Sequence, residues 1–285
     1  MVLGLVVIFA LCFVSIKAGL RFAPPLRFAG LRLLIAGFAL LSLVVIRREP
    51  VIPPRRILLP MLTLALIANT IAYGAMFMSP GRTGAGIASV LGNTQPLFTI
   101  VLAAAFLGER MTRGKSVALG FGIAGATLIA YPALVAPSTY GVSGAALALV
   151  VSAGSATGSI IVKRMGPLPS LLAVSAWALL IGSVPLLVAS TIVERGQPIA
   201  WTAEFVILLI FLAVIGTSLT TATWYWLVQR SDVGQLTTFL FLVPVFGIAL
   251  AAILFGERLN LFEAAGIALI ITGIGVGVRT PWQGT

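Results

Sequence analysis

The stretch Gly86–Arg110, GIASVLGNTQPLFTIVLAAAFLGER, occurs a second time in the chain as Gly234–Arg258, GQLTTFLFLVPVFGIALAAILFGER. The two copies align without a gap at a constant offset of 148 positions, so that Pro96 falls on Pro244. A long apolar run with an internal proline and a Gly-Glu-Arg ending is too specific a pattern to recur by composition alone. The sequence therefore predicts a tandem duplication.

The composition indicates that the chain lies in lipid. Of its 285 residues 60% are hydrophobic and 9% charged, with a mean hydropathy of +1.14, and no water-soluble surface can be built from such a chain. The net charge of +11 would suggest nucleic acid for a soluble protein. Here the Lys and Arg residues mainly separate apolar runs of about 20 residues, which is typical of membrane topology and contact with anionic lipid.

The apolar runs predict an all-α integral membrane fold with ten transmembrane helices. Their approximate ranges are Val2–Leu20, Arg27–Ile46, Ile57–Met78, Gly84–Leu107, Ser116–Ala133, Val142–Val162, Ser170–Val193, Glu204–Val228, Val233–Phe255 and Leu261–Val278. The uncharged link 137–141 divides them into two repeats of five helices, residues 1–136 and 137–285. Because five is odd, the second repeat enters the membrane inverted relative to the first.

The basic residues favour a cytoplasmic (inner) membrane location with both termini in the cytoplasm. The doubly basic loop that contains Arg47, Arg48, Arg55 and Arg56 is then cytoplasmic, as the excess of Lys and Arg in cytoplasmic loops requires. The basic cluster after the first helix opposes this orientation.

Inverted halves are the usual construction of secondary transporters, which rock about a binding site near the bilayer midplane. We therefore expect alternating-access transport of a small-molecule substrate. A channel and, less favoured, a membrane-embedded enzyme are the alternatives, but the spans contain neither a filter-like loop nor a cluster of catalytic groups. The expected partners are the substrate and membrane lipid, without nucleic acid. We expect a monomer, and a homodimer remains open.

The segments PLFTIVLAAAFLGER and PVFGIALAAILFGER, together with Lys17 and with Pro25 followed by Arg32, resemble the EamA-type members of the drug/metabolite transporter superfamily. The resemblance covers essentially the whole chain. It implies an exporter or exchanger of small metabolites, with ten helices and cytoplasmic termini, but it names no substrate. As substrate we expect a small metabolite, with an amino acid or a related compound as one candidate. The Trp-Gly pair common in the first helix of that family is replaced here by Phe9-Ala10.

The two aligned prolines are predicted to interrupt their helices. Each leaves the carbonyl one turn earlier, near Gly92 for Pro96 and near Leu240 for Pro244, without its helical donor. A bend that opens the helix to the substrate is one interpretation, and a packing kink is the other.

Polar side chains in two neighbouring spans are predicted to bind substrate. Asn69 and Tyr73 lie one helical turn apart, and Asn93 and Gln95 precede the first aligned proline. Contact of Asn and Gln side chains with lipid is energetically unfavourable, so a polar cavity would explain their presence in these spans. Hydrogen bonding between helices is the alternative.

Two cations and two aromatic residues complete the predicted substrate site. Lys17 or Arg32 would pair with the carboxylate of an anionic or amino-acid substrate, unless these side chains extend to the interface. Trp177 and Trp224 would form an aromatic wall, with an interfacial belt as the alternative for Trp224.

The sequence predicts no metal, no cofactor and no proton relay. It has no histidine and a single cysteine, Cys12, which leaves no zinc or haem site of the usual kind and no internal disulfide. All seven acidic residues fall in loops or at the ends of predicted helices. We therefore expect facilitated transport or exchange rather than proton antiport through a buried carboxylate.

Overall fold

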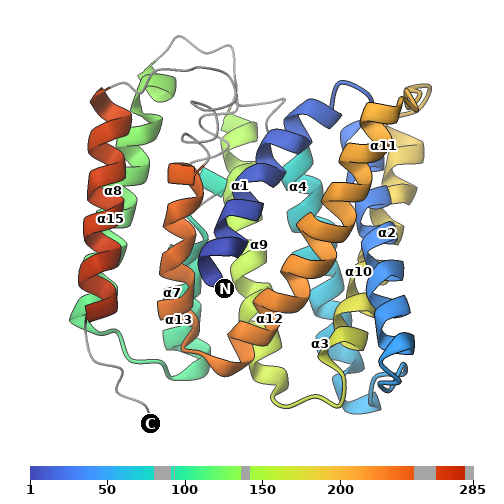
Figure 1. Cartoon of the computed structure of the whole chain (residues 1–285), viewed down its shortest axis with the longest axis horizontal. Coiled ribbons are helices and arrows are strands. Elements are labelled where there is room, and N and C mark those ends of the chain that lie inside the picture. The colour runs from blue at the N-terminus through green and yellow to red at the C-terminus, as the bar shows by residue number, and fades with distance from the viewer. Residues whose placement is uncertain (80–90, 93, 136–141, 247–260, 280–285) are drawn as a thin grey trace.

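The computed structural model describes residues 1–79, 91–92, 94–135, 142–246 and 261–279. All regular structure in these ranges is helical (Figure 1). Six helical spans in the described ranges are long and apolar enough to cross a membrane: Val2–Gly19, Pro25–Ile46, Arg55–Met78, Ala146–Met165, Leu171–Val193 and Ala203–Arg230. Shorter apolar helices cover Gln95–Leu107, Val233–Phe246 and Ala264–Gly273. The prediction of an all-α integral membrane protein is confirmed.

Several of these spans are built from more than one helical segment. Before the link at 137–141 the elements are α1 (Val2–Gly19), α2 (Pro25–Ile46), η1 (Arg55–Ile57), α3 (Leu58–Leu64), η2 (Ala65–Ile71), α4 (Ala72–Met78), α7 (Gln95–Leu107) and α8 (Arg113–Val135). After the link they are α9 (Val142–Met165), α10 (Leu171–Val193), α11 (Ala203–Ile210), η3 (Phe211–Leu219), α12 (Thr220–Arg230), α13 (Val233–Thr238), η4 (Phe239–Phe241) and α15 (Leu261–Arg279).

The helix boundaries follow local chemistry. Helix α2 begins at Pro25, two residues before the predicted start, because a proline is well tolerated in the first helical turn. Ser170 caps α10, its Oγ accepting the backbone N–H of Ala173 at 3.0 Å. Helix α7 ends at Gly108, whose φ of 69° suits a residue without a side chain.

The segments η2 and η3 are π-helical, with each turn one residue wider than an α-helical turn. The offset of 148 positions carries Ala65–Ile71 onto residues 213–219, which lie inside Phe211–Leu219. The duplication seen in the sequence is therefore repeated in the backbone, at a departure from α-helical geometry that is rare in proteins.

Each π-helical segment is hydrogen-bonded to a helix on the other side of the link. The Thr70 hydroxyl of η2 donates to the Gly182 carbonyl of α10 at 2.9 Å, and the aligned Ser218 hydroxyl of η3 donates to the Ala36 carbonyl of α2 at 2.9 Å. The η2 contact is close, because a Cβ on Gly182 would lie 2.8 Å from the Ala65 carbonyl oxygen.

Helices from the two sides of the link also pack in antiparallel pairs. Helices α8 and α15 lie side by side at one edge, and α2 packs against α10 at the other (Figure 1). Glu194, at the end of α10, accepts the backbone N–H of Leu26 at the start of α2, at 2.6 Å. Glu49, beyond the end of α2, accepts the Ser170 hydroxyl at the start of α10, also at 2.6 Å. Acids at helix exits thus stabilise the N-termini of partner helices.

Candidate functional site

A cavity of about 150 Å³ is lined by helices from both sides of the link. Its polar and aromatic lining residues with a hydrogen-bonding group are Arg32, Asn69, Tyr73, Gln95, Ser155, Ser159, Thr220, Thr221, Trp224 and Tyr225. The remaining lining residues are Phe9, Cys12, Phe13, Ala68, Ala72, Met76, Gly92, Val151, Gly216, Leu240 and Val243. Such a mixture of apolar walls and few polar groups is typical of small-molecule sites.

Five of the residues predicted to bind substrate line this cavity: Arg32, Asn69, Tyr73, Gln95 and Trp224. The structure does not bring Lys17 or Trp177 to it. Lys17 is exposed at the end of α1, and the Trp177 indole donates to the Val51 carbonyl at 2.9 Å. Asn93 lies outside the described residues.

Arg32, in the middle of α2, is 2% exposed and is the largest of the fully buried side chains in the described ranges. Its Nε donates to the Thr217 hydroxyl at 2.7 Å and its Nη2 to the Gly216 carbonyl at 3.0 Å. Its guanidinium carbon lies 5.3 Å from the centre of the Tyr73 ring. Nη1 is buried without a hydrogen-bond partner, so both N–H groups of this nitrogen are unused.

The π-helical segments supply two aligned polar side chains at this site. Asn69 of η2 is 3% exposed and lines the cavity. Thr217 of η3, which the offset of 148 positions pairs with Asn69, accepts the hydrogen bond of Arg32. Thr217 also donates to the Leu212 carbonyl, five residues earlier, at 2.9 Å. The widened helices therefore position the polar groups of the site.

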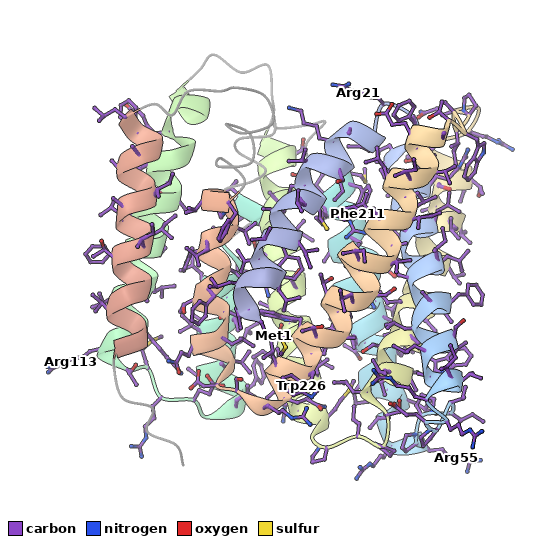
Figure 2. The ribbon with its side chains drawn as sticks, viewed as in Figure 1. Met1, Arg21, Arg55, Arg113, Phe211 and Trp226 are labelled. Carbon is purple, nitrogen blue, oxygen red and sulfur yellow. The ribbon has the colours of Figure 1, made fainter. Side chains whose placement is uncertain are left out.

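Trp224 faces inward and Trp226 faces outward. Trp224 is 7% exposed, and its indole N–H donates to the Ser159 hydroxyl at 3.1 Å. Phe9, at the position where the family resemblance led us to expect tryptophan, meets Trp224 edge to face at a centroid distance of 6.3 Å. Trp226, at the lower end in Figure 2, is 41% exposed and lies under the Arg230 guanidinium. Of these two tryptophans, Trp226 has the exposure of an interfacial residue.

Pro96 lies in the first turn of α7, directly after a break in the helix. Thr94, which lies at the break and precedes α7, has φ −80° and ψ 6°. The Ser152 hydroxyl of α9 lies 2.7 Å from the Leu91 carbonyl oxygen and 2.8 Å from that of Gly92. A side chain from another helix thus supplies the donor that the proline removes near Gly92.

Pro244 is buried and follows the 3-10 turn η4. Leu240, whose carbonyl the proline deprives of its helical donor, contributes to the cavity wall. Both aligned prolines therefore follow an irregular turn that borders the cavity. Pro96 follows a break in the helix, and Pro244 follows a 3-10 turn.

An ionic network joins residues from both sides of the link, close to Arg113 at the lower end in Figure 2. Lys115 Nζ lies 3.2 Å from Glu109 Oε2 and 2.7 Å from Asp232 Oδ2. Glu109 also accepts the backbone N–H groups of Val233 and Gly234, at 2.8 and 3.0 Å. The first Gly-Glu-Arg motif therefore binds the N-terminus of α13, the helix that opens the second copy of the repeat.

Asp232 closes the network and caps α13 by accepting the Gln235 N–H at 2.7 Å. Burial raises the pKa of the Asp232 carboxyl, but hydrogen bonds from Lys115 and from the Gln235 N–H together lower the pKa below its ordinary value. Asp232 is therefore ionised at neutral pH.

Sequence reasoning missed the serine residues of α9. Ser152 hydrogen-bonds to the helix break before α7. Ser155 lines the cavity, and Ser159 accepts the indole N–H of Trp224. Their spacing of three and then four positions places them on one face of a helix, and this pattern was the available signal.

Comparison with known proteins shows to which protein family this chain is similar. The model of the EamA-like transporter family matches residues 1–131 and again 142–278. A probable amino-acid metabolite efflux pump of Salmonella typhimurium is 32% identical, over 96% of this chain and 92% of that protein. The uncharacterized transporter YvbV of Bacillus subtilis is also 32% identical, over 90% of this chain and 84% of that protein.

The fold also resembles that of a protein whose crystal structure has been solved. The two superpose with a TM-score of 0.77, over 96% of this chain and 93% of the other, at 18% sequence identity. At that identity the likeness concerns the fold alone.

Proposed function

The chain belongs to the EamA-like transporter family, and from that premise we propose that it exports or exchanges a small amino-acid-related metabolite across the cytoplasmic membrane. Relatives named as amino-acid metabolite efflux pumps support this substrate class. The family and these names indicate a transporter rather than an enzyme. The observation that carries the proposal is the cavity, because both sequence copies of the family model contribute to its walls.

We propose that ten spans form two inverted five-helix halves with both termini in the cytoplasm. Three observations support an inverted relationship. The π-helical segments coincide under the 148-position offset, and their hydroxyl groups bond reciprocally to α10 and α2. In Figure 1 α2 runs antiparallel to its counterpart α10, and α8 runs antiparallel to its counterpart α15.

Alternating access requires contacts between the halves that break and re-form on each side of the cavity. The network of Glu109, Lys115 and Asp232 is such a contact. It lies toward the same end as Arg55, Arg113 and Trp226, opposite to Arg21 (Figure 2). Under the proposed orientation this end is cytoplasmic. We propose that the network closes the cytoplasmic side of the cavity and opens when substrate enters from the cytoplasm.

The test is counterflow in proteoliposomes against a panel of amino acids, their metabolites, sugars and nucleosides. Thr221 lines the cavity, so Thr221→Phe is expected to fill it and abolish counterflow. Thr191 is exposed on α10, and Thr191→Phe is the matched control that should retain flux. Single-channel currents, or equal flux in the two variants, would contradict the proposal.

A further inference from the structure

The cavity contains a cation without a carboxylate partner in the described part of the chain. Arg32 bonds to the hydroxyl of Thr217 and the carbonyl of Gly216, and its Nη2 lies 3.9 Å from the Cys12 sulfur. All three partners are formally neutral. A charge buried in the membrane is costly unless it is paired, so an unpaired guanidinium at a cavity wall indicates that a ligand supplies the anion.

The acidic residues whose side chains the structure describes are all engaged or exposed elsewhere. Glu109 and Asp232 pair with Lys115, and Glu194 binds the start of α2. Glu49 accepts the Ser170 hydroxyl, and Glu204 is exposed in the first turn of α11. None of these five lines the cavity, and therefore the cavity offers the ammonium group of a ligand no counterion among them.

One part of the remaining wall fits an apolar body. Phe9 and Phe13 of α1, with Leu240 and Val243, contribute apolar surface. The indole N–H of Trp224 is already bonded to Ser159, so Trp224 presents its ring rather than a donor to the cavity. Asn69 lines the same cavity and can hydrogen-bond to a carboxylate or to a neutral polar group.

We propose that the cargo is an organic carboxylate with an apolar body and no charged amine, its carboxylate bound by the guanidinium of Arg32. This inference rests on the proposed transport function and narrows its substrate class: a deaminated or N-acylated relative of an amino acid is preferred over the zwitterion. A carboxylate beside the guanidinium would supply the missing hydrogen-bond acceptor and pair the positive charge at the same time. The ammonium of a zwitterion would be desolvated without compensation.

The test is equilibrium binding to the purified full-length protein in detergent with three ligands that share a phenylethyl body. 3-Phenylpropionate carries only the carboxylate, phenylalanine carries both charges, and phenethylamine carries only the ammonium. We expect 3-phenylpropionate to bind at least about tenfold more tightly than phenylalanine, and phenethylamine not to compete. This ranking uses the unmodified chain, so it does not depend on the folding of any variant.

Variants then assign the selectivity to one side chain. Arg32→Gln is expected to weaken 3-phenylpropionate binding by about 30-fold or more, the scale for removing one partner of a buried charge pair. Arg32→Lys should give an intermediate affinity, because it keeps the charge but not the planar fork. Arg21 is exposed at the opposite end from Arg113 (Figure 2), and Arg21→Gln is the matched control with unchanged affinity.

Three results would overturn the inference: phenylalanine or phenethylamine binding as tightly as the acid, no binding of any of the three, or unchanged affinity in folded Arg32→Gln. Counterflow of an amine or a zwitterion without the acid would leave the transport function standing and refute the anion selectivity. Binding of the acid without counterflow of any compound would support the anion site and refute transport.

Discussion

The carboxylate of Glu109 accepts the backbone N–H of Val233 at 2.8 Å. Glu109 closes the first copy of the repeated stretch, and Val233 is the first residue of the helix that opens the second copy. The charged ending of one copy thus stabilises the positive N-terminal end of the other, across 124 positions of sequence. Any motion that separates the two copies at this end must break this contact.

Glu109→Gln is expected to lower stability by about 1 to 3 kcal/mol, because a neutral amide replaces the acceptor of charge-assisted hydrogen bonds. The measurement is the midpoint of thermal unfolding in detergent. Glu204 is exposed in the first turn of α11, so Glu204→Gln should change stability by less than about 1 kcal/mol. An equal loss in both variants would mean that Glu109 contributes only its charge.

The contribution of Asp232 to folding stability should be lost at acidic pH. Its pKa lies below the ordinary value of 3.8, despite burial, because of the Lys115 and Gln235 hydrogen bonds. A carboxyl group whose pKa is lower in the folded than in the unfolded protein stabilises the fold at pH values above its unfolded-state pKa. This stabilisation is lost as the pH falls through its folded-state pKa. The difference in unfolding midpoint between the unmodified chain and Asp232→Asn should therefore be constant from about pH 8 to 5 and shrink below about pH 4. A difference that persists in acid would show a contribution other than ionisation.

Gly182→Ala should disrupt the contact between η2 and α10. The added methyl group would lie 2.6 Å from the Asn69 Cβ and 2.8 Å from the Ala65 carbonyl oxygen. Overpacking against backbone costs about 1 to 3 kcal/mol, which the unfolding midpoint in detergent would record. A Cβ atom added to Gly120 of α8 would meet no other atom within 4 Å, so Gly120→Ala should be neutral or stabilising.

Ser152→Ala would remove the hydroxyl that bonds to the Leu91 and Gly92 carbonyls at the helix break before Pro96. The Leu91 carbonyl keeps the backbone N–H and the hydroxyl of Thr94 as donors. The Gly92 carbonyl would be left unpaired, which costs about 1 to 3 kcal/mol in a membrane interior, so we expect a lower unfolding midpoint and reduced counterflow. Thr157 bonds only to the Ala153 carbonyl of its own helix, and Thr157→Val should retain flux. Full activity in Ser152→Ala would indicate that water replaces the hydroxyl.

Flux should not depend on an imposed pH gradient. No carboxylate among the described residues lines the cavity, and Glu109 is bound to Lys115 and α13. Counterflow in proteoliposomes with and without a pH gradient tests this expectation. A strong dependence that Glu109→Gln abolishes would show that proton antiport operates through this residue.

Much of the fold followed from local signals. Apolar runs located the described spans, although α2 begins at Pro25, two residues before the predicted start. The high cost of polar groups in lipid selected Arg32 and Asn69, which both line the cavity. These are properties of single residues in their immediate sequence context.

What could not be predicted depends on distant parts of the chain. The η2 segment is bonded to α10 through Thr70 and Gly182, which are 112 positions apart. Trp177 and Trp224 carry similar local signals, yet one binds a loop carbonyl and the other lines the cavity. Nothing near either tryptophan in the sequence specifies which neighbour it meets.

The two π-helical segments have a historical consequence. A π turn is rare and usually appears as a single widened turn within an α-helix. If η2 and η3 had arisen after the duplication, this rare turn would have had to appear twice, at matching places. One appearance suffices if the widened turn was present in the repeat before it was copied.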